Sequence, residues 1–280
     1  MLAEHRPLPY TVAMTDATGP KNSSPVREFA AAIIFLTRIP IRLSGDWPAD
    51  LNQRALVWFP IVGALIGAAG GLLYWGLFLL GLPPGLAGGV TVAGLLLLTG
   101  ALHEDGLADV ADGLGGGRDR DHKLTIMKDS RIGTYGGAAL VLSLGLRVGA
   151  LAVLADPRAA ALALIGAHAH SRGLLPAWKA LWPDARATGT AADIGRPNGA
   201  RSLVAAVIGL TLAATALGEV GAGGATGLLI LAVAAAASFA LPALAARQVG
   251  GITGDILGAA QQTGEIVFLL AVVAALAPAL

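Results

Sequence analysis

The sequence predicts an all-α, polytopic helical membrane protein with about seven transmembrane helices and an N-terminal interfacial helix. Hydrophobic residues fill 55% of the 280 positions, charged residues only 13%, and the mean hydropathy is +0.70. A soluble domain of this length could not bury so much apolar surface. Several uncharged runs also approach the roughly 20 residues that a helix needs to cross the hydrocarbon core. The chain has no cysteine, which excludes disulfides, thiolate catalysis and zinc–thiolate sites.

The first elements precede the predicted spans. Residues 1–24 are rich in Pro, Ser, Asn and Thr and contain no signal-peptide core, so they are expected to form a disordered tail. Residues 26–39 lie between Pro25 and Pro40 and carry an apolar stripe, but they are too short to cross a membrane. They are expected to form a helix at the membrane surface. Residues 25–280 are expected to be a single integral membrane domain that carries the catalytic groups.

Seven apolar stretches are expected to cross the membrane. Two of them contain arginine or histidine, and the last is so short that only partial insertion is expected. Tight turns rich in glycine or proline alternate with longer polar segments between the stretches. The stretches cover residues 56–80, 83–102, 138–155, 159–175, 203–218, 220–246 and 266–280.

Lys and Arg residues concentrate on one side of this seven-span arrangement. Of the 19 such residues, 16 fall on the side that holds the tail, the 103–137 segment, the 176–202 loop and the 247–264 loop. Cytoplasmic loops of membrane proteins carry an excess of Lys and Arg, so this side is expected to be cytoplasmic.

An acidic cluster follows the uncharged residues 83–102 directly. Glu104, Asp105, Asp109 and Asp112 arrive within nine residues. At about 100° per residue, the three aspartates share one face of a helix. Their mutual repulsion favours a divalent cation, and oxygen ligands favour Mg²⁺ or Mn²⁺. We therefore expect these four residues to bind metal and the three aspartates to be catalytic, whereas the alternative is a solvated acidic helix end.

A glycine-rich segment and five cations follow the acidic cluster. Flexible glycines beside acids and cations are suited to a site that holds both metal and phosphate. The expected phosphate-binding residues here are Arg118, Lys128, Ser130 and Arg131, with Asp129 as a further catalytic acid. Ordinary positive charge beside a membrane span is the alternative interpretation.

Three later residues also attract attention. Arg172, near the cytoplasmic end of its span, is expected to bind phosphate, and snorkelling to lipid phosphate is the alternative. Asp255 follows glycines that suggest a bent backbone approaching a ligand, and a plain loop is the alternative. Arg147 lies inside a span, where a cation usually has a partner, but the sequence does not identify one.

These blocks together resemble the cobalamin synthase family, the adenosylcobinamide-GDP ribazoletransferases. The resemblance covers about residues 26–280 in the same order, and one departure from the family pattern is Glu104, where an apolar residue is expected. The matching blocks are residues 35–40, the acidic block through Gly113, and residues 126–134, 171–173 and 253–259.

The resemblance implies an enzyme that joins α-ribazole, or its 5′-phosphate, to adenosylcobinamide-GDP with release of GMP and with a requirement for Mg²⁺. It further implies a multi-pass protein of the bacterial cytoplasmic (inner) membrane whose active site faces the cytoplasm. The implied partners are these two substrates and the lipid bilayer, with no nucleic acid, and a homo-oligomer is left open.

Three other functions fit parts of the sequence. An intramembrane prenyltransferase usually has two separated Asp-rich motifs, whereas here the second would be Asp255 alone. A CDP-alcohol phosphotransferase has a longer Asp spacing. A divalent-cation transporter would place carboxylates within facing spans, whereas here they cluster at one face.

Overall fold

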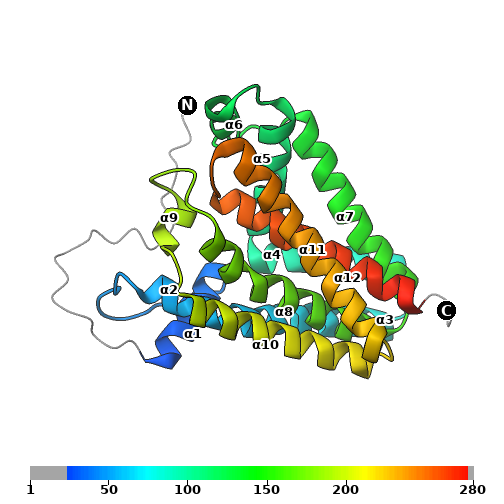
Figure 1. Ribbon diagram of the computed structural model, residues 1–280. Coiled ribbons are helices and arrows are strands. Elements are labelled where there is room, and N and C mark those ends of the chain that lie inside the picture. The colour runs from blue at the N-terminus through cyan, green and yellow to red at the C-terminus, as the bar shows by residue number, and fades with distance from the viewer. Residues whose placement is uncertain (1–23, 277–280) are drawn as a thin grey trace.

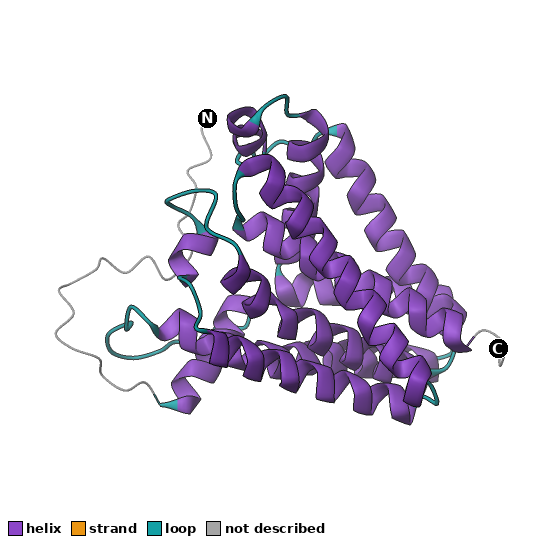
Figure 2. Cartoon of the chain, in the orientation of Figure 1, coloured by secondary structure: helices purple, strands orange, loops and turns teal. Residues whose placement is uncertain are grey.

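The computed structural model describes residues 24–276, and within this range helices make up most of the chain (Figure 1, Figure 2). The predicted disordered tail lies outside the described residues, apart from Ser24. The helices are α1 (Pro25–Leu36), α2 (Leu51–Ala55), η1 (Leu56–Trp58), α3 (Phe59–Leu79), α4 (Pro84–Thr99), α5 (Leu102–Gly116), α6 (Arg120–Ile126), α7 (Thr134–Leu154), α8 (Pro157–Leu181), α9 (Thr190–Ile194), α10 (Gly199–Glu219), α11 (Gly224–Val249) and α12 (Gly254–Leu276).

The structure confirms an all-helical, multi-pass membrane protein. Five continuous helical segments between residues 24 and 276 are long and apolar enough to cross a membrane, and α4 with α5 adds a sixth if this bent pair is one broken span. The predicted number of seven is not confirmed. The remaining long helix, α8, has 25 residues but carries several buried polar side chains that lower its hydropathy.

The connections between consecutive long helices gather at one end of the molecule. In Figure 1 the turns α3–α4, α7–α8 and α10–α11 lie at the right, while α1, α2, α6 and α9 lie toward the opposite end. The three turns are short, as the glycine and proline pattern predicts. The short helices and longer loops therefore surround the polar end of the bundle.

Small residues allow the central helix α8 to pack closely against its neighbours. α8 makes its most extensive contacts with α3 and α10. A Cβ atom at Gly63, Gly67 or Gly71 of α3 would lie within 3.0 Å of α8 atoms. Close packing through small residues is typical of helices in lipid, where hydrophobic attraction between helices is absent.

A sharp bend separates the apolar helix α4 from the acidic helix α5. The sequence shows no break here, but the two helix axes differ by 92°. Gly100 (φ +67°) ends α4, and Ala101 (φ +55°) is also in the left-handed region. Glycine tolerates this conformation without strain. The bend turns the acidic residues across the end of the bundle.

The last helix differs from the prediction. The sequence suggested a loop over residues 247–264 and a short, partly inserted span over 266–280, but α12 begins at Gly254 and has 23 residues. The prediction was wrong because Gln261, Gln262 and Glu265 interrupt the apolar run that marks a span in the sequence. All three are buried against other helices.

Candidate active site

A cavity of about 900 Å³ lies at the polar end of the bundle. Its wall combines residues of α5, α8, α9 and α12 with the 127–132 and 186–189 loops, and apolar residues of α1 and η1 complete it. Eight charged residues line it: Asp105, Asp109, Lys128, Asp129, Arg131, Lys179, Arg186 and Asp255.

Close packing of α12 on α5 brings carboxylates of both helices to the cavity. A Cβ atom at Gly106 would lie 2.7 Å from the carbonyl oxygen of Asp255, so only glycine fits between Asp105 and Asp109 of α5. Asp109 is close enough to Asp105 and Asp255 to interact electrostatically with both. Thr253 donates its hydroxyl to Asp255 Oδ2 at 3.1 Å. The structure thus joins Asp255 to the predicted pair Asp105 and Asp109.

A magnesium ion at these carboxylates would need oxygens of a substrate as further ligands. Among residues 24–276, no three His, Cys, Asp or Glu side chains converge closely enough to hold a metal by themselves. Mg²⁺ keeps several waters and is commonly bound through one or two carboxylates plus substrate phosphates. Asp105, Asp109 and Asp255 supply oxygen donors of this kind along one wall. Protein side chains alone do not supply a complete set of metal ligands at this site.

Asp112 is held outside the cavity by the start of α7. Its Oδ2 accepts the backbone N–H of Gly133 at 2.7 Å, and its Oδ1 accepts that of Gly136 at 2.8 Å. A carboxylate is favourable here because helix N-termini carry partial positive charge. The structure therefore separates Asp112 from Asp105 and Asp109, with which it was predicted to bind metal.

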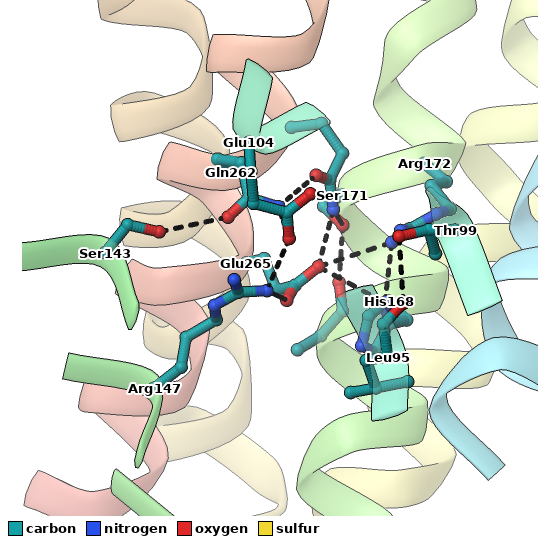
Figure 3. Close-up of polar contacts among 12 residues, drawn as sticks. Leu95, Thr99, Glu104, Ser143, Arg147, His168, Ser171, Arg172, Gln262 and Glu265 are labelled. Carbon is teal, nitrogen blue, oxygen red and sulfur yellow. Dashed lines mark hydrogen bonds and ion pairs between the residues drawn. The ribbon is translucent and has the colours of Figure 1, made fainter. Parts of the chain in front are cut away.

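Behind α5, a second group of ionised side chains is buried between four helices (Figure 3). Arg147 of α7 lies 2.9 Å from Glu104 of α5 and 3.2 Å from Glu265 of α12. Arg172 of α8 lies 3.3 Å from the other oxygen of Glu265 and donates to His168 Nδ1 at 2.7 Å. Two arginines and two glutamates balance in charge. The buried network is the name we give to these residues and their hydrogen-bond partners: Glu104, Arg147, His168, Ser171, Arg172, Gln261, Gln262 and Glu265.

Amide groups complete the buried network. Gln262 donates to Glu104 Oε1 at 3.2 Å. Gln261 donates to Glu265 Oε2 at 2.6 Å and to the Ser171 hydroxyl at 2.9 Å. Buried charges are tolerated where they are paired and hydrogen-bonded. The network therefore fixes α5 relative to α7, α8 and α12.

Two predicted site residues do not line the cavity. Glu104 and Arg172 are only 5% and 1% exposed, and both point into the buried network (Figure 3). Glu104 was predicted to bind metal and Arg172 phosphate, but an oppositely charged partner holds each of them. The partners of Arg147 that the sequence did not identify are Glu104 and Glu265.

The predicted basic segment lies at the edge of the cavity. Lys128, Ser130 and Arg131 line it, whereas Arg118 does not. Arg131 is 87% exposed and forms a bidentate pair with Asp129, its Nη2 lying 2.6 Å from Oδ2. This hydrogen-bonded guanidinium holds the pKa of Asp129 below its usual value. Phosphate binding by the segment stays a prediction.

Two cations in the cavity were missed at the sequence level. Lys179 is 2% exposed, and its Nζ lies 2.5 Å from Asp184. Arg186 extends from the loop after α8, with its Nη1 3.7 Å from Asp255 Oδ2. The only feature of the sequence that points to these two residues is the concentration of cations in the 176–202 loop, and that feature also has a plain explanation in membrane topology.

Comparison with known proteins agrees with this arrangement. The profile of the cobalamin-5-phosphate synthase family matches residues 28–273. The adenosylcobinamide-GDP ribazoletransferase of Bradyrhizobium diazoefficiens is 47% identical over 245 residues, which is 88% of this chain and 92% of the relative. That of Mesorhizobium japonicum is 44% identical over 249 residues, or 87% and 91% of the two chains.

A more distant relative gives the same result, since the enzyme of the same name from Ralstonia nicotianae is 42% identical over 247 residues, 87% of this chain and 93% of the relative. No solved structure matches the chain. The profile extends from α1 to α12, and so covers both the cavity and the buried network. The chain belongs to the cobalamin-5-phosphate synthase family.

Proposed function

We propose that this chain is an adenosylcobinamide-GDP ribazoletransferase, which joins α-ribazole or its 5′-phosphate to adenosylcobinamide-GDP. The observation that carries the proposal is a single cavity with carboxylates on one wall and cations beside them. This combination suits a diphosphate, whose oxygens need cations and whose metal ion needs carboxylates. The names of the relatives support this activity over a prenyltransferase, a CDP-alcohol phosphotransferase or a transporter.

The reaction is substitution at phosphorus. A free ribose hydroxyl of the ribazole attacks the phosphorus that is bonded to cobinamide, and a new P–O bond forms. The P–O bond to the guanosine-bearing phosphate breaks, so that GMP leaves. The proton of the attacking hydroxyl passes to a carboxylate in the cavity. A 5′-phosphate on the acceptor, when present, stays on the ribose and is carried into the product.

Residues on different elements would divide this work. Asp105, Asp109 and Asp255 would hold Mg²⁺, which supplies charge neutralisation for the diphosphate when it is bound. Lys128 and Arg131 would bind non-bridging oxygens or the departing GMP. Apolar residues of α1 and η1 cover another part of the wall and shield the reacting groups from water.

We further propose that the protein lies in the bacterial cytoplasmic membrane with the cavity facing the cytoplasm. The excess of Lys and Arg at the cavity end supports this orientation. Both substrates are large polar molecules, and a cytoplasmic opening lets them enter without crossing the bilayer.

The test is direct. Membranes containing the protein are incubated with adenosylcobinamide-GDP and α-ribazole, with and without Mg²⁺, and the products are separated by chromatography. We expect a cobalamin product and GMP in equal amounts only when Mg²⁺ is present. Absence of both products from membranes that hold inserted protein would contradict the proposed activity.

A further inference from the structure

Arg186 occupies an unusual position in the cavity. It lies on the loop between α8 and α9, far in sequence from the acidic helix α5, yet its side chain is only 17% exposed. Its charge acts on Asp109 of α5 as well as on Asp255 of α12. A single guanidinium therefore lies between carboxylates that belong to two helices.

The guanidinium of Arg186 has hydrogen-bond donors to spare. Its Nη2 donates to the carbonyl oxygen of Leu124 at 2.7 Å. Its Nη1 lies 3.7 Å from Asp255 Oδ2, which is longer than the usual 2.7–3.2 Å of a hydrogen bond. Its Nε is buried and has no partner among residues 24–276. Guanidinium has five N–H donors, and the hydrogen bond to Leu124 uses one of them.

Two other cations of the cavity are committed to close carboxylate partners. Lys179 lies 2.5 Å from Asp184, and Arg131 lies 2.6 Å from Asp129. Arg186 makes no such short contact. It can neutralise Asp109 and Asp255 across a gap and still bind an incoming anion.

The backbone that carries Arg186 is held in place, so only its side chain needs to move. Ala185 donates its N–H to the carbonyl oxygen of Ile252 at 2.8 Å. Arg120 of α6 donates to the carbonyl oxygens of Ala185 and Val249 at 2.9 and 3.0 Å. The segment before α12 and the loop that carries Arg186 are thereby tied together.

We propose that Arg186 is a diphosphate-binding residue that neutralises Asp109 and Asp255 until substrate arrives. Resting on the proposed function, this means that Arg186 and Mg²⁺ compete for the same carboxylates. Asp109 and Asp255 would hold the metal ion of an entering metal–diphosphate, and the guanidinium of Arg186 would then bind phosphate oxygens. A planar fork of donors is suited to this contact.

The test uses two binding measurements on the purified, full-length protein. Binding of Mn²⁺ alone is followed by electron paramagnetic resonance of the free ion. Binding of GDP at saturating Mn²⁺ is followed by equilibrium dialysis. In Arg186→Gln we expect Mn²⁺ to bind about tenfold more tightly, because a competing positive charge is gone. GDP should bind at least about tenfold more weakly, because charge-assisted hydrogen bonds are lost.

Arg186→Lys separates the two effects. It keeps the positive charge, so Mn²⁺ affinity should stay near the wild-type value, but lysine cannot reproduce the planar fork and GDP affinity should fall. Arg158→Gln is the matched control, since Arg158 pairs with Glu219 on the surface at the opposite end of the bundle, and both affinities should be unchanged. Arg120→Gln loosens the same loop without removing a cavity charge.

Opposite changes in the two affinities would support the proposal, because a loosened loop cannot tighten metal binding. Unchanged or weaker Mn²⁺ binding in Arg186→Gln would overturn it, as would unchanged GDP binding or the same losses in Arg120→Gln. Wild-type protein that binds no GDP would overturn it as well. If the proposed function alone were wrong, Mn²⁺ and GDP would bind as expected, but the membranes would form no cobalamin product.

Discussion

Asp109 and Asp112 lie on the same helix, one turn apart, in opposite environments. Asp109 lines the cavity and faces other carboxylates, so its charge has an unfavourable environment until a cation arrives. Asp112 accepts two short hydrogen bonds from the first turn of α7. The first arrangement is typical of a functional carboxylate and the second of a structural one.

Replacing each of these aspartates by asparagine should therefore give different defects. Asp109→Asn should lower turnover by about a hundredfold or more while the melting temperature stays near the wild-type value, because it removes a metal-binding charge from an open cavity. Asp112→Asn should destabilise the protein by about 1.5–3 kcal/mol, because a charge-assisted hydrogen bond is lost and one N–H of α7 faces an amide. Turnover and thermal unfolding in detergent measure the two effects.

The result has a simple control. Asp121→Asn removes an exposed charge of α6 outside the cavity, and both measurements should be unchanged. A normal melting temperature for Asp112→Asn together with a large loss of turnover would contradict the structural role of Asp112 and restore its predicted place in the metal site.

At the residue scale, the sequence predicted the kind of side chains in the cavity better than it predicted which residues line it. The spacing of Asp105 and Asp109 was sufficient to place them together on a helix. Glu104 was predicted to bind metal, because its partner Arg147 is on another helix and nothing in the local sequence links them. Arg186 was missed for the same reason, since its approach to Asp255 depends on how two loops pack.

Between elements, the contact of α5 with α12 depends on a glycine. Gly106→Ala would place a Cβ atom 2.7 Å from the Asp255 carbonyl oxygen and force the two helices apart. Misplacing catalytic groups by about 1 Å can cost roughly a hundredfold in rate, so we expect a loss of that order although no charge changes. Turnover of purified protein measures the loss.

Gly149→Ala is the matched control, because no atom lies within 4 Å of a Cβ at that position in α7. It should retain full turnover and should not lower stability, since alanine favours helix over glycine. Equal turnover in the two variants would show that the spacing of α5 and α12 does not control the site.

The buried network makes a second prediction about helix association. Arg147→Gln leaves two glutamates beside one arginine, and Glu104→Gln leaves the reverse. Each change should cost about 3–5 kcal/mol, because it strands a buried charge. The double variant restores charge balance between Glu265 and Arg172 and should be more stable than either single variant. Thermal unfolding of the three proteins tests this double-mutant cycle, and additive losses would contradict the pairing.

Among the elements, the apolar helices were predicted well and the polar ones poorly. Uncharged runs of sufficient length gave α3, α10 and α11 nearly at their observed bounds. The start of α12 was missed because amphipathic pattern alone cannot distinguish polar side chains that face solvent from those that face buried partners. The bend at Gly100 was missed because a single glycine within an apolar run is also compatible with a continuous helix.

For the whole molecule, the distribution of charge predicts which end faces the cytoplasm. Because the chain has no cysteine, single cysteines can report on this without background. Asp121→Cys in α6 lies at the cavity end, and Glu219→Cys lies at the opposite end, and both side chains are exposed. An impermeant thiol reagent applied to cells with a permeable outer envelope and an intact inner membrane should label only the second. Labelling of the first alone would invert the proposed orientation.

The pairing of Arg172 with Glu265 has a consequence for how the protein is made. These residues lie 93 positions apart, and the arginine is synthesised first. A ribosome adds about 5–20 residues each second, so Arg172 waits roughly 5–20 s for its anion. Glu104 is made earlier still, but one glutamate balances only one of the two arginines. The nascent bundle therefore carries an uncompensated cation until α12 emerges. Any chain truncated before Glu265 keeps that uncompensated charge within the bundle.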